Sequence, residues 1–445
     1  MSPIIATPIS AGKSIPRHVA SMLVIACLGL PVLSAAAFAA DVLTLADAQR
    51  RALERSHQLV AQDFSIAASR YMAVAAGQLP DPVLKVGIDN LPVNGRDRFS
   101  LSNDFMTMRR IGVMQEITRI DKRRSRGDRY EREAEKKIAE KELAAAAIGR
   151  DTALAWLDRY YAEAMAAVVD EQGEQAMLEI QAAEGSYRAG RGNQADVLAA
   201  RSTLAAFDDR RSELGQRVRN AKTMLARWIG EAADMPLAAK PDMEAISLGP
   251  ATLERQLAHH PQIVVLDRQE ELARAELRLT EANKKSDWTV EVAYAQRGPA
   301  YSDMVSIGVS IPLQWDQKNR QDRELSARLA LLGQAQVERR ELLRSHGAEV
   351  RVMINEWENQ RERHARYQRE LIPLANDRTR AAVAAYRGGK SGLADVLAAR
   401  RNEIDMRIQA LQRETEAARL WARINFLLPV SSAASHSTLS AREAK

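Results

Sequence analysis

The sequence has very little cysteine, few aromatic residues and long stretches without proline. The one cysteine is Cys27, so the chain cannot form an internal disulfide, and any mature form that lacks Cys27 has no thiolate metal site. Aromatic residues make up 5% of the chain and charged residues 27%, which is typical of long helices and coiled coils. The fold must therefore be stabilised mainly by packing between helices.

Long apolar runs are also missing after the first forty residues, where none approaches the eighteen or so residues of a membrane-spanning helix. The formal net charge of +6 arises from 64 basic and 58 acidic residues that are interspersed along the chain. This near balance provides no concentrated basic surface, so we expect no nucleic-acid partner. If the mature protein enters a membrane, it must do so as β-strands.

The first 39 residues have the features of a secretory signal peptide. A basic stretch precedes the apolar residues 19–38, and the sequence Ala-Phe-Ala at 37–39 offers small side chains to signal peptidase. We predict cleavage after Ala39, which would remove Cys27. The alternative is a lipoprotein in which Cys27 is lipidated, because the sequence VIAC at 24–27 resembles a lipobox.

An internal repeat at an offset of 199 residues is the strongest signal in the sequence. Residues 187–201 (YRAGRGNQADVLAAR) and 386–400 (YRGGKSGLADVLAAR) are identical at ten of fifteen positions. The chain is therefore predicted to contain two structural repeats of roughly 200 residues, too long for a solenoid repeat. We place the first repeat at 40–245, the second at 246–429 and a disordered tail at 430–445.

Each repeat is predicted to consist of an amphipathic helix, two strands, a long helix, a glycine-containing turn and a second long helix. The predicted ranges are helices 45–78, 119–186 and 194–230 with strands 83–91 and 106–117, then helices 251–284, 316–386 and 394–428 with strands 288–297 and 304–313. No proline occurs between Pro92 and Pro236, whereas Pro373 predicts a kink in the second copy. Helices of this length need partner helices along their whole side.

The four predicted strands alternate between apolar and polar or small residues, as in Val305, Ile307 and Val309 against Ser306 and Ser310. They have about the length of tilted transmembrane strands. Four strands cannot span lipid alone, because their edge backbone groups would stay unpaired in hydrocarbon. Three protomers would supply twelve strands for a closed barrel. Two ordinary β-hairpins capping a helical bundle are the alternative.

The sequence resembles the TolC family of outer-membrane factors over essentially the whole mature chain. The pattern Tyr-x-x-Gly-x-x-x-x-x-Asp-Val-x-x-Ala, which marks the periplasmic helix turns of that family, occurs twice, as Tyr187, Gly190, Asp196, Val197, Ala200 and as Tyr386, Gly389, Asp395, Val396, Ala399. The resemblance implies a mainly α fold with a small membrane β-barrel. In the homotrimer, two repeats per chain would build a 12-stranded barrel in the outer membrane and a 12-helix barrel across the periplasm.

The resemblance also implies roles for the repeated turns. Asp395 and Tyr386 match positions that line and hold shut the periplasmic aperture, although the second acidic residue of the family pattern is Ala398 here. The turns would dock a periplasmic adaptor through Tyr187, Arg188, Gly190, Arg191, Asp196, Arg387, Gly389 and Lys390. The alternatives are that the aspartates only stabilise helix starts and that the basic residues are only solvated.

Within the family, residues 79–92 and 104–116 look like the heavy-metal efflux branch, which works with an inner-membrane pump of the resistance-nodulation-division type. This implies an exit duct for heavy-metal cations, needing no cofactor and no metal site. Met106 and Met108 are conceivable soft ligands for Cu(I), but strand packing is the more ordinary role. The sequence has neither H-x-x-x-H nor C-x-x-C spacing.

Three other functions stay open at this stage. The chain could be an outer-membrane factor through which drugs or secreted proteins leave the cell. It could also be a periplasmic coiled-coil structural or adaptor protein without a barrel. An enzyme is not expected, because the sequence shows no nucleophile elbow, phosphate loop or cluster of metal ligands, and its seven histidines, including the adjacent His259 and His260, have no partner spacing.

Overall fold

A computed structural model describes residues 42–190, 193–246 and 253–427. The predicted signal peptide with Cys27 and the predicted tail 430–445 lie outside these residues. The described residues all belong to one unit, so the two predicted repeats do not fold as separate domains.

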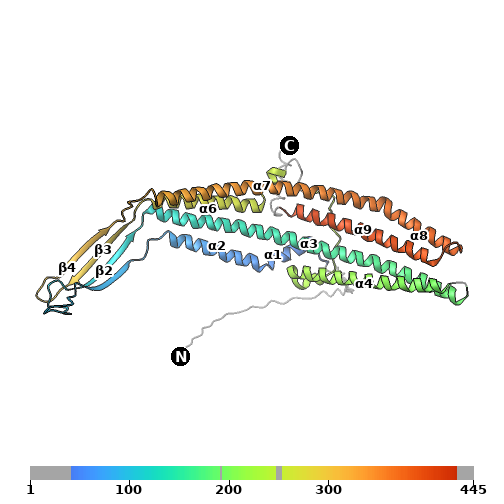
Figure 1. The fold of residues 1–445 in the computed structure, drawn as a ribbon, viewed down its shortest axis with the longest axis horizontal. Helices are drawn as coiled ribbons and strands as arrows, with labels where there is room; N and C mark the ends of the chain where they lie inside the picture. The colour runs from blue at the N-terminus through green and yellow to red at the C-terminus, as the bar shows by residue number, and fades with distance from the viewer. Residues whose placement is uncertain (1–41, 191–192, 247–252, 428–445) are drawn as a thin grey trace, which may run out of the picture. The chain divides into compact units, whose positions relative to one another are not determined.

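The elements occur in the same order twice along the chain (Figure 1). The first half contains α1 (Leu45–Glu54), α2 (His57–Ala76), β1 (Val83–Asp89), β2 (Met108–Ile117), α3 (Ile120–Arg188), α4 (Gln194–Ile229) and the 3-10 helix η1 (Gly230–Asp234). The second half contains α5 (Leu253–Leu257), α6 (Pro261–Asn283), β3 (Trp288–Gln296), β4 (Met304–Ser310), α7 (Gln321–Arg366), the π-helical segment η2 (Tyr367–Leu371), α8 (Ile372–Arg387) and α9 (Leu393–Asn425).

The helices lie side by side in two rows that share α3 (Figure 1). Next to the sheet the order is α2, α3, α6, α7, and farther along α3 it is α4, α3, α9, α8. The helix α3 is continuous over 69 residues, because no proline interrupts it and its middle is rich in alanine. The ends of the first row are α2 and α7, which the packing within this chain does not bring together.

The prediction of one continuous helix at the start of each repeat is wrong, because the structure has two shorter helices there in both repeats. The first breaks at Arg55 and Ser56, where the Ser56 hydroxyl accepts a hydrogen bond from the Leu59 amide and caps α2. The second breaks before Pro261, which occupies the first turn of α6, with His260 as the capping residue.

The long helix of the second repeat also differs from the prediction. It begins at Gln321 rather than at residue 316 and is interrupted at Tyr367–Leu371 by the π-helical segment η2. Pro373 lies two residues after the end of this segment, in the first turn of α8. Proline has no N–H and its ring collides with the carbonyl four residues earlier, so the regular helix cannot pass through this point unchanged.

The strands are slightly shorter than predicted, and each end has a local cause. β1 ends at Asp89 because Asn90 has a φ of 55° and Pro92 follows. β4 ends at Ser310 rather than at residue 313, since Pro312 cannot donate to the ladder. β2 begins at Met108 and β3 ends at Gln296.

The four strands form one antiparallel sheet in the order β1-β2-β3-β4. The two halves of the chain meet at its centre, where Ile111 pairs with Tyr294 and Val113 with Val292. Between them Gly112 opposes Ala293, and a Cβ on Gly112 would lie only 2.7 Å from the Ala293 Cβ. A glycine is therefore needed at this position, because a larger side chain would collide with β3.

The main apolar core surrounds the middle of α3 and draws on both halves of the chain. Trp156 and Leu157 are fully buried there, and the Trp156 indole N–H donates to the Leu43 carbonyl at 3.1 Å. Leu43 in turn forms a parallel bridge to Leu237 in the segment that joins the two halves.

A buried ion pair fixes the junction between sheet and helices. The Lys122 ammonium lies 2.6 Å from the Asp287 carboxylate, and both side chains are largely buried. Burial alone would raise the pKa of Asp287, but hydrogen bonds from Lys122 and from the Arg119 amide outweigh it and lower this pKa below its ordinary value. The pair joins the start of α3 to the residue just before β3.

Replacing Lys122 by methionine should lower the free energy of unfolding by about 3 kcal/mol, because Asp287 would be left partly buried without a counterion. Lys285→Met is the matched control at the same junction. Lys285 contacts Asp121 at 3.1 Å but is well exposed, so its loss should cost less than about 1 kcal/mol. Denaturant titration of the purified protein measures both, and equal losses would contradict this account. The Lys122–Asp287 contribution should persist above the ordinary aspartate pKa of 3.8 and vanish as the pH falls below it.

Candidate functional site

The ends of α3 and α8 and the starts of α4 and α9 form one surface, which we call the tip. Both helix ends reverse direction at a glycine with positive φ, 69° at Gly190 and 68° at Gly389. The Gly190 amide donates to the Tyr187 carbonyl, and the Gly389 amide donates to the Tyr386 carbonyl, each at 2.9 Å. These are the left-handed helix ends that glycine adopts without strain.

The returning helices begin with different caps. The Asn193 side chain accepts a hydrogen bond from the Ala195 amide at 3.0 Å, whereas Gly392 offers α9 no side-chain cap. Asp196 and Asp395 lie in the first turns of α4 and α9, where a carboxylate meets the positive end of the helix dipole. Asp196 Oδ1 also lies 3.8 Å from the position that a Cβ would take on Gly392, so its charge is near the start of α9.

A small apolar core holds the two turns together, with Ile180, Ala200, Leu393, Val396 and Leu397 buried at its centre. The repeated residues are not equivalent within it. Leu397 is 3% exposed, while Leu198, its counterpart in the other repeat, is 60% exposed. Likewise Tyr386 packs against this core, whereas Tyr187 is 44% exposed.

The predicted docking residues gather at the tip with one exception, since Arg191 lies outside the described residues. Arg188, Arg387 and Lys390 are exposed, and the Lys390 amide donates to the Ala385 carbonyl as part of the helix end. Asp395 is exposed as well, and Asp196 is half-buried. The sequence thus located the surface, but the pattern gave no means to distinguish the two turns.

One buried charge beneath the tip was missed by the sequence analysis. The Glu403 side chain is 3% exposed and lies 3.0 Å from Arg407 and 3.4 Å from Arg400. It borders a cavity of about 300 Å³ between α8 and α9, which Arg380 and Arg387 also line. The Arg-x-x-Glu-x-x-x-Arg spacing on one helix was the available signal, because it places all three side chains on one face.

At the opposite end of α3, one face of the sheet is almost wholly apolar and exposed. Its residues occupy alternate positions of all four strands and are between 43% and 75% exposed: Leu84, Val86, Ile88, Ile111, Val113, Ile117, Trp288, Val292, Tyr294, Val305, Ile307 and Val309. The polar residues on this face, Arg109, Gln115 and Gln296, lie toward the strand ends. Soluble proteins rarely expose a contiguous apolar surface of this kind.

The opposite face of the sheet, which we call the polar face, carries charged side chains among small and apolar ones, and an ion network runs across three of its strands. Glu291 of β3 pairs with Lys85 of β1 at 2.7 Å and with Arg110 of β2. Arg110 also lies 3.5 Å from Asp89. Two basic and two acidic groups therefore neutralise one another on the face that is suited to water.

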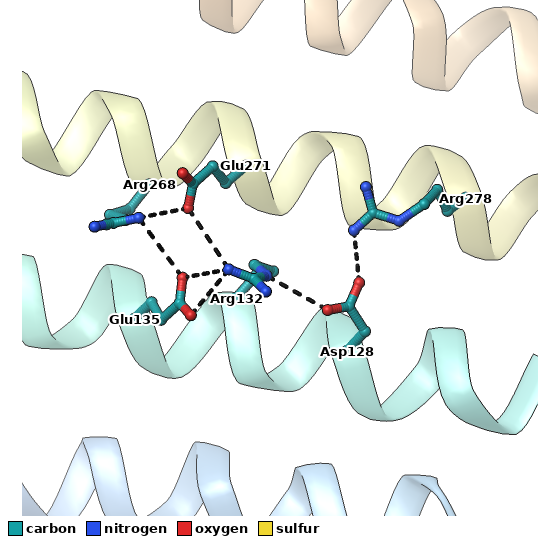
Figure 2. Close-up of polar contacts among 6 residues, drawn as sticks. All are labelled: Asp128, Arg132, Glu135, Arg268, Glu271 and Arg278. Carbon is teal, nitrogen blue, oxygen red and sulfur yellow. Dashed lines mark hydrogen bonds and ion pairs between the residues drawn. The ribbon is translucent and has the colours of Figure 1, made fainter.

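A second network joins α6 to α3 (Figure 2). Arg132 of α3 lies 2.8 Å from Glu135 and 3.9 Å from Glu271 of α6, and Arg268 of α6 lies 2.7 Å from Glu271. Farther along, Arg278 contacts Asp128 at 2.6 Å, and Asp128 also contacts Arg132. Single exposed pairs contribute little, but six linked groups of balanced charge fix how α6 aligns with α3.

Neither a metal centre nor a membrane helix is found in the part of the chain that the structure describes. Over that part, no three His, Cys, Asp or Glu side chains are grouped so that they could hold a metal ion. Met106 lies before β2, half-exposed, and Met108 begins the strand. Among the same residues, no helix has the length and apolarity to cross a bilayer.

Comparison with known proteins identifies the fold. No protein-family model matches the sequence, and no curated protein matches it closely. Solved structures do match, although at low identity. The outer membrane protein VceC from Vibrio cholerae has a TM-score of 0.70 at 18% identity, with 86% of this chain and 95% of that chain covered. CusC gives 0.72 at 13% identity, covering 86% and 91%. The Campylobacter jejuni CmeC outer membrane channel gives 0.71 at 12%, covering 86% and 85%. The chain has the fold of these channel proteins.

The unequal burial of the two turns leads to a test with matched positions. Leu397→Ala should lower the free energy of unfolding by about 3 kcal/mol, since a buried leucine is truncated. Leu198→Ala, the equivalent change in the other repeat, should stay within about 0.5 kcal/mol. Both values come from denaturant titration with a probe at the tip. Equal losses would mean that the two turns are packed alike.

Proposed function

We propose that three copies of this chain form an outer-membrane channel, which serves as the exit duct of a tripartite efflux system. The observation that carries this proposal is the four-stranded sheet, which has one exposed apolar face, one polar face and two unpaired edges. The fold shared with outer-membrane channel proteins agrees with it. The predicted signal peptide supplies the export route.

The sheet needs partner strands to exist in lipid. Within the described chain β1 pairs only with β2 and β4 only with β3, so one edge of each outer strand is open. Unpaired backbone groups cost several kcal/mol each in hydrocarbon. Three such sheets, joined edge to edge, close a twelve-stranded barrel with the apolar faces toward lipid and the polar faces, with Lys85, Arg110 and Glu291, toward a water-filled lumen.

Aromatic side chains mark both ends of the proposed spanning region. Trp288 and Trp315, at the helix end of the sheet, are 53% and 88% exposed. Phe99 and Phe105, in the loop between β1 and β2 at the far end, are 55% and 57% exposed. Exposed aromatic rings in two bands are typical of the interfaces where barrel proteins leave the lipid.

The outer helices of the row next to the sheet, α2 and α7, expose apolar side chains as the sheet does. The side of α2 that faces away from α3 is a charge-free apolar stripe, with Val60 51%, Phe64 73% and Tyr71 75% exposed. At the other end of the row, α7 exposes Leu329 and Val337. We propose that the α2 stripe packs against α7 of the next protomer, so that four helical positions per chain build a ring of twelve.

The tip would then face the periplasm, where we propose two roles for it. Asp395 and Tyr386 are the aperture residues, with three Asp395 carboxylates gathered around the threefold axis. The adaptor would dock on the exposed parts of the turns, through the residues named in the sequence analysis. Leu198 adds an exposed apolar side chain to that surface, which the sequence analysis did not foresee.

Heavy-metal cations are the substrate class that we propose, on the strength of the sequence resemblance at residues 79–92 and 104–116. The adaptor and a resistance-nodulation-division pump of the inner membrane would be the partners. A conduit needs no tight metal site, since strong binding would slow the exit of the ion. Loss of the gene should increase sensitivity to heavy-metal salts, while increased sensitivity to drugs alone would favour a drug channel.

A periplasmic coiled-coil protein without a barrel is the second candidate. It accounts for the long helices and the signal peptide. It gives no reason for twelve apolar strand residues that face outward on one side of the sheet, so the observation that favours the channel also disfavours this alternative.

Phe64→Asp together with Tyr71→Asp should reduce trimer formation roughly tenfold or more, because carboxylates would be buried in an apolar seam. The wild-type protein from outer-membrane fractions should run as a trimer-sized band on unheated SDS gels, and the variant as a monomer. Arg70→Asp places the same group beside the stripe and should leave the band unchanged. A wild-type protein that is monomeric and soluble without detergent would contradict the channel.

Asp395→Asn should weaken block by a trivalent cation about tenfold in planar bilayers, which corresponds to about 1.4 kcal/mol of lost attraction at the proposed aperture. Asp196→Asn removes the equivalent charge from the other turn, where it lies against the start of α9, and should leave the block unaltered. Identical behaviour of the two variants would remove Asp395 from the aperture.

A further inference from the structure

Two histidines from distant parts of the chain meet where α6 begins. His260 caps α6, its ring lies 4.8 Å from the ring of His346 in α7, centroid to centroid, and only 5% of it is exposed. The sequence analysis found no partner for His260, because the two histidines are far apart and share no motif. The adjacent His259 is exposed and differs in this respect.

The cap requires that one nitrogen of His260 carry no proton. Its Nδ1 accepts a hydrogen bond from the Gln262 amide at 3.2 Å. The Gln262 side chain continues the contact, since its Oε1 lies 3.0 Å from Nε2 of His346. Protonation of His260 Nδ1 would remove this acceptor and place a positive charge at the positive end of the α6 dipole.

The surroundings of His260 offer little to stabilise such a charge. The histidines line a cavity of about 390 Å³ with Arg150 and Asp151 of α3, Glu349 of α7 and Arg423 of α9. Asp151 is engaged by Arg150 at 2.9 Å, and Glu349, mostly exposed, lies 3.6 Å from His346. Burial, followed by the charges of His346 and Arg150, lowers the pKa of His260 to about 4.

The position of the pair gives its protonation a mechanical consequence. In the row next to the sheet, α6 is the helix that lies between α3 and α7. Its first turn is fixed by the His260 cap, by the Gln262–His346 contact and by Ile263, which is fully buried. Loss of the cap would therefore weaken the hold of this first turn on α7.

We propose that His260 and His346 form an acid-sensitive latch, which holds the start of α6 against α7 at neutral pH and releases it in acid. The latch is a property of the chain itself and does not depend on the substrate. A protein beyond the inner membrane experiences the pH of the surroundings, so such a latch would couple the helical wall to external acid.

The sign of the effect follows from the direction of the shift. The fold favours neutral His260, so the stabilisation is complete above the ordinary histidine pKa of 6.5 and is lost as the pH falls from 6.5 to about 4. Local opening at the start of α6 should increase by up to roughly 300-fold across this range, since each pKa unit corresponds to a factor of ten.

Hydrogen exchange of the intact protein in detergent, corrected for the intrinsic rate at each pH, tests this. In the wild type, peptides covering the start of α6 and His346 should lose protection between pH 6.5 and 4, while those of the start of α3, residues 120–130, which do not line this cavity, should not. His260→Asn keeps a capping acceptor that does not titrate, and should remove the pH dependence. His259→Asn, next to it and exposed, should retain it.

Two results of this experiment would contradict the proposal. A pH-independent wild type, or a His260→Asn variant with the wild-type profile, would overturn the latch. His346→Gln provides a second measure, because loss of the neighbouring imidazole should shift the transition of His260 toward higher pH. An unshifted transition would show that the two rings do not act together.

Discussion

Backbone hydrogen bonding at the outer edges of β1 and β4 sets the main constraint on this structure. Each of these strands has one neighbour in the described chain, so a row of N–H and C=O groups on its other side has no strand partner. Such edges invite pairing with another chain. The sheet also exposes a face of apolar side chains. A single sheet is therefore unfavourable in water, because of its apolar face, and in lipid, because of its unpaired edges. The proposed trimer follows from this condition more directly than from any one motif.

The helical rows, like the sheet, leave their outer sides without a partner in the described part of this chain. The long helices also differ between the two halves of the chain. In the first half, α3 runs without interruption from the sheet to the tip. In the second half, the corresponding path is divided by the π-helical segment at Tyr367–Leu371. The tip has the same asymmetry, since Leu397 is buried where Leu198 is exposed. Although the two halves share one sequence unit, the helical path from the sheet to the tip is continuous in the first half and interrupted in the second.

Periodicity and repetition predicted the order of the elements, because long helices and alternating strands express their patterns locally. The exceptions were decided by single residues. Ser56 and Pro261 split helices whose apolar pattern continues across the break, and Pro312 shortens a strand whose alternation continues past it. The repeated Tyr-Gly-Asp pattern located the tip. It could not reveal that Glu403 is buried or that His260 meets His346, since such contacts depend on how distant segments pack. The aperture and docking roles stay predictions.

The pairing of β2 with β3 has a consequence for how the chain reaches its native state. The Arg110–Glu291 contact across these strands joins residues that are 181 positions apart. Contacts of such high sequence separation form slowly, because a large loop must close first. The β1–β2 hairpin must therefore wait, with the second edge of β2 unpaired, until the second half of the polypeptide is available. During that interval the unpaired edge of β2 can pair with other chains, which favours aggregation.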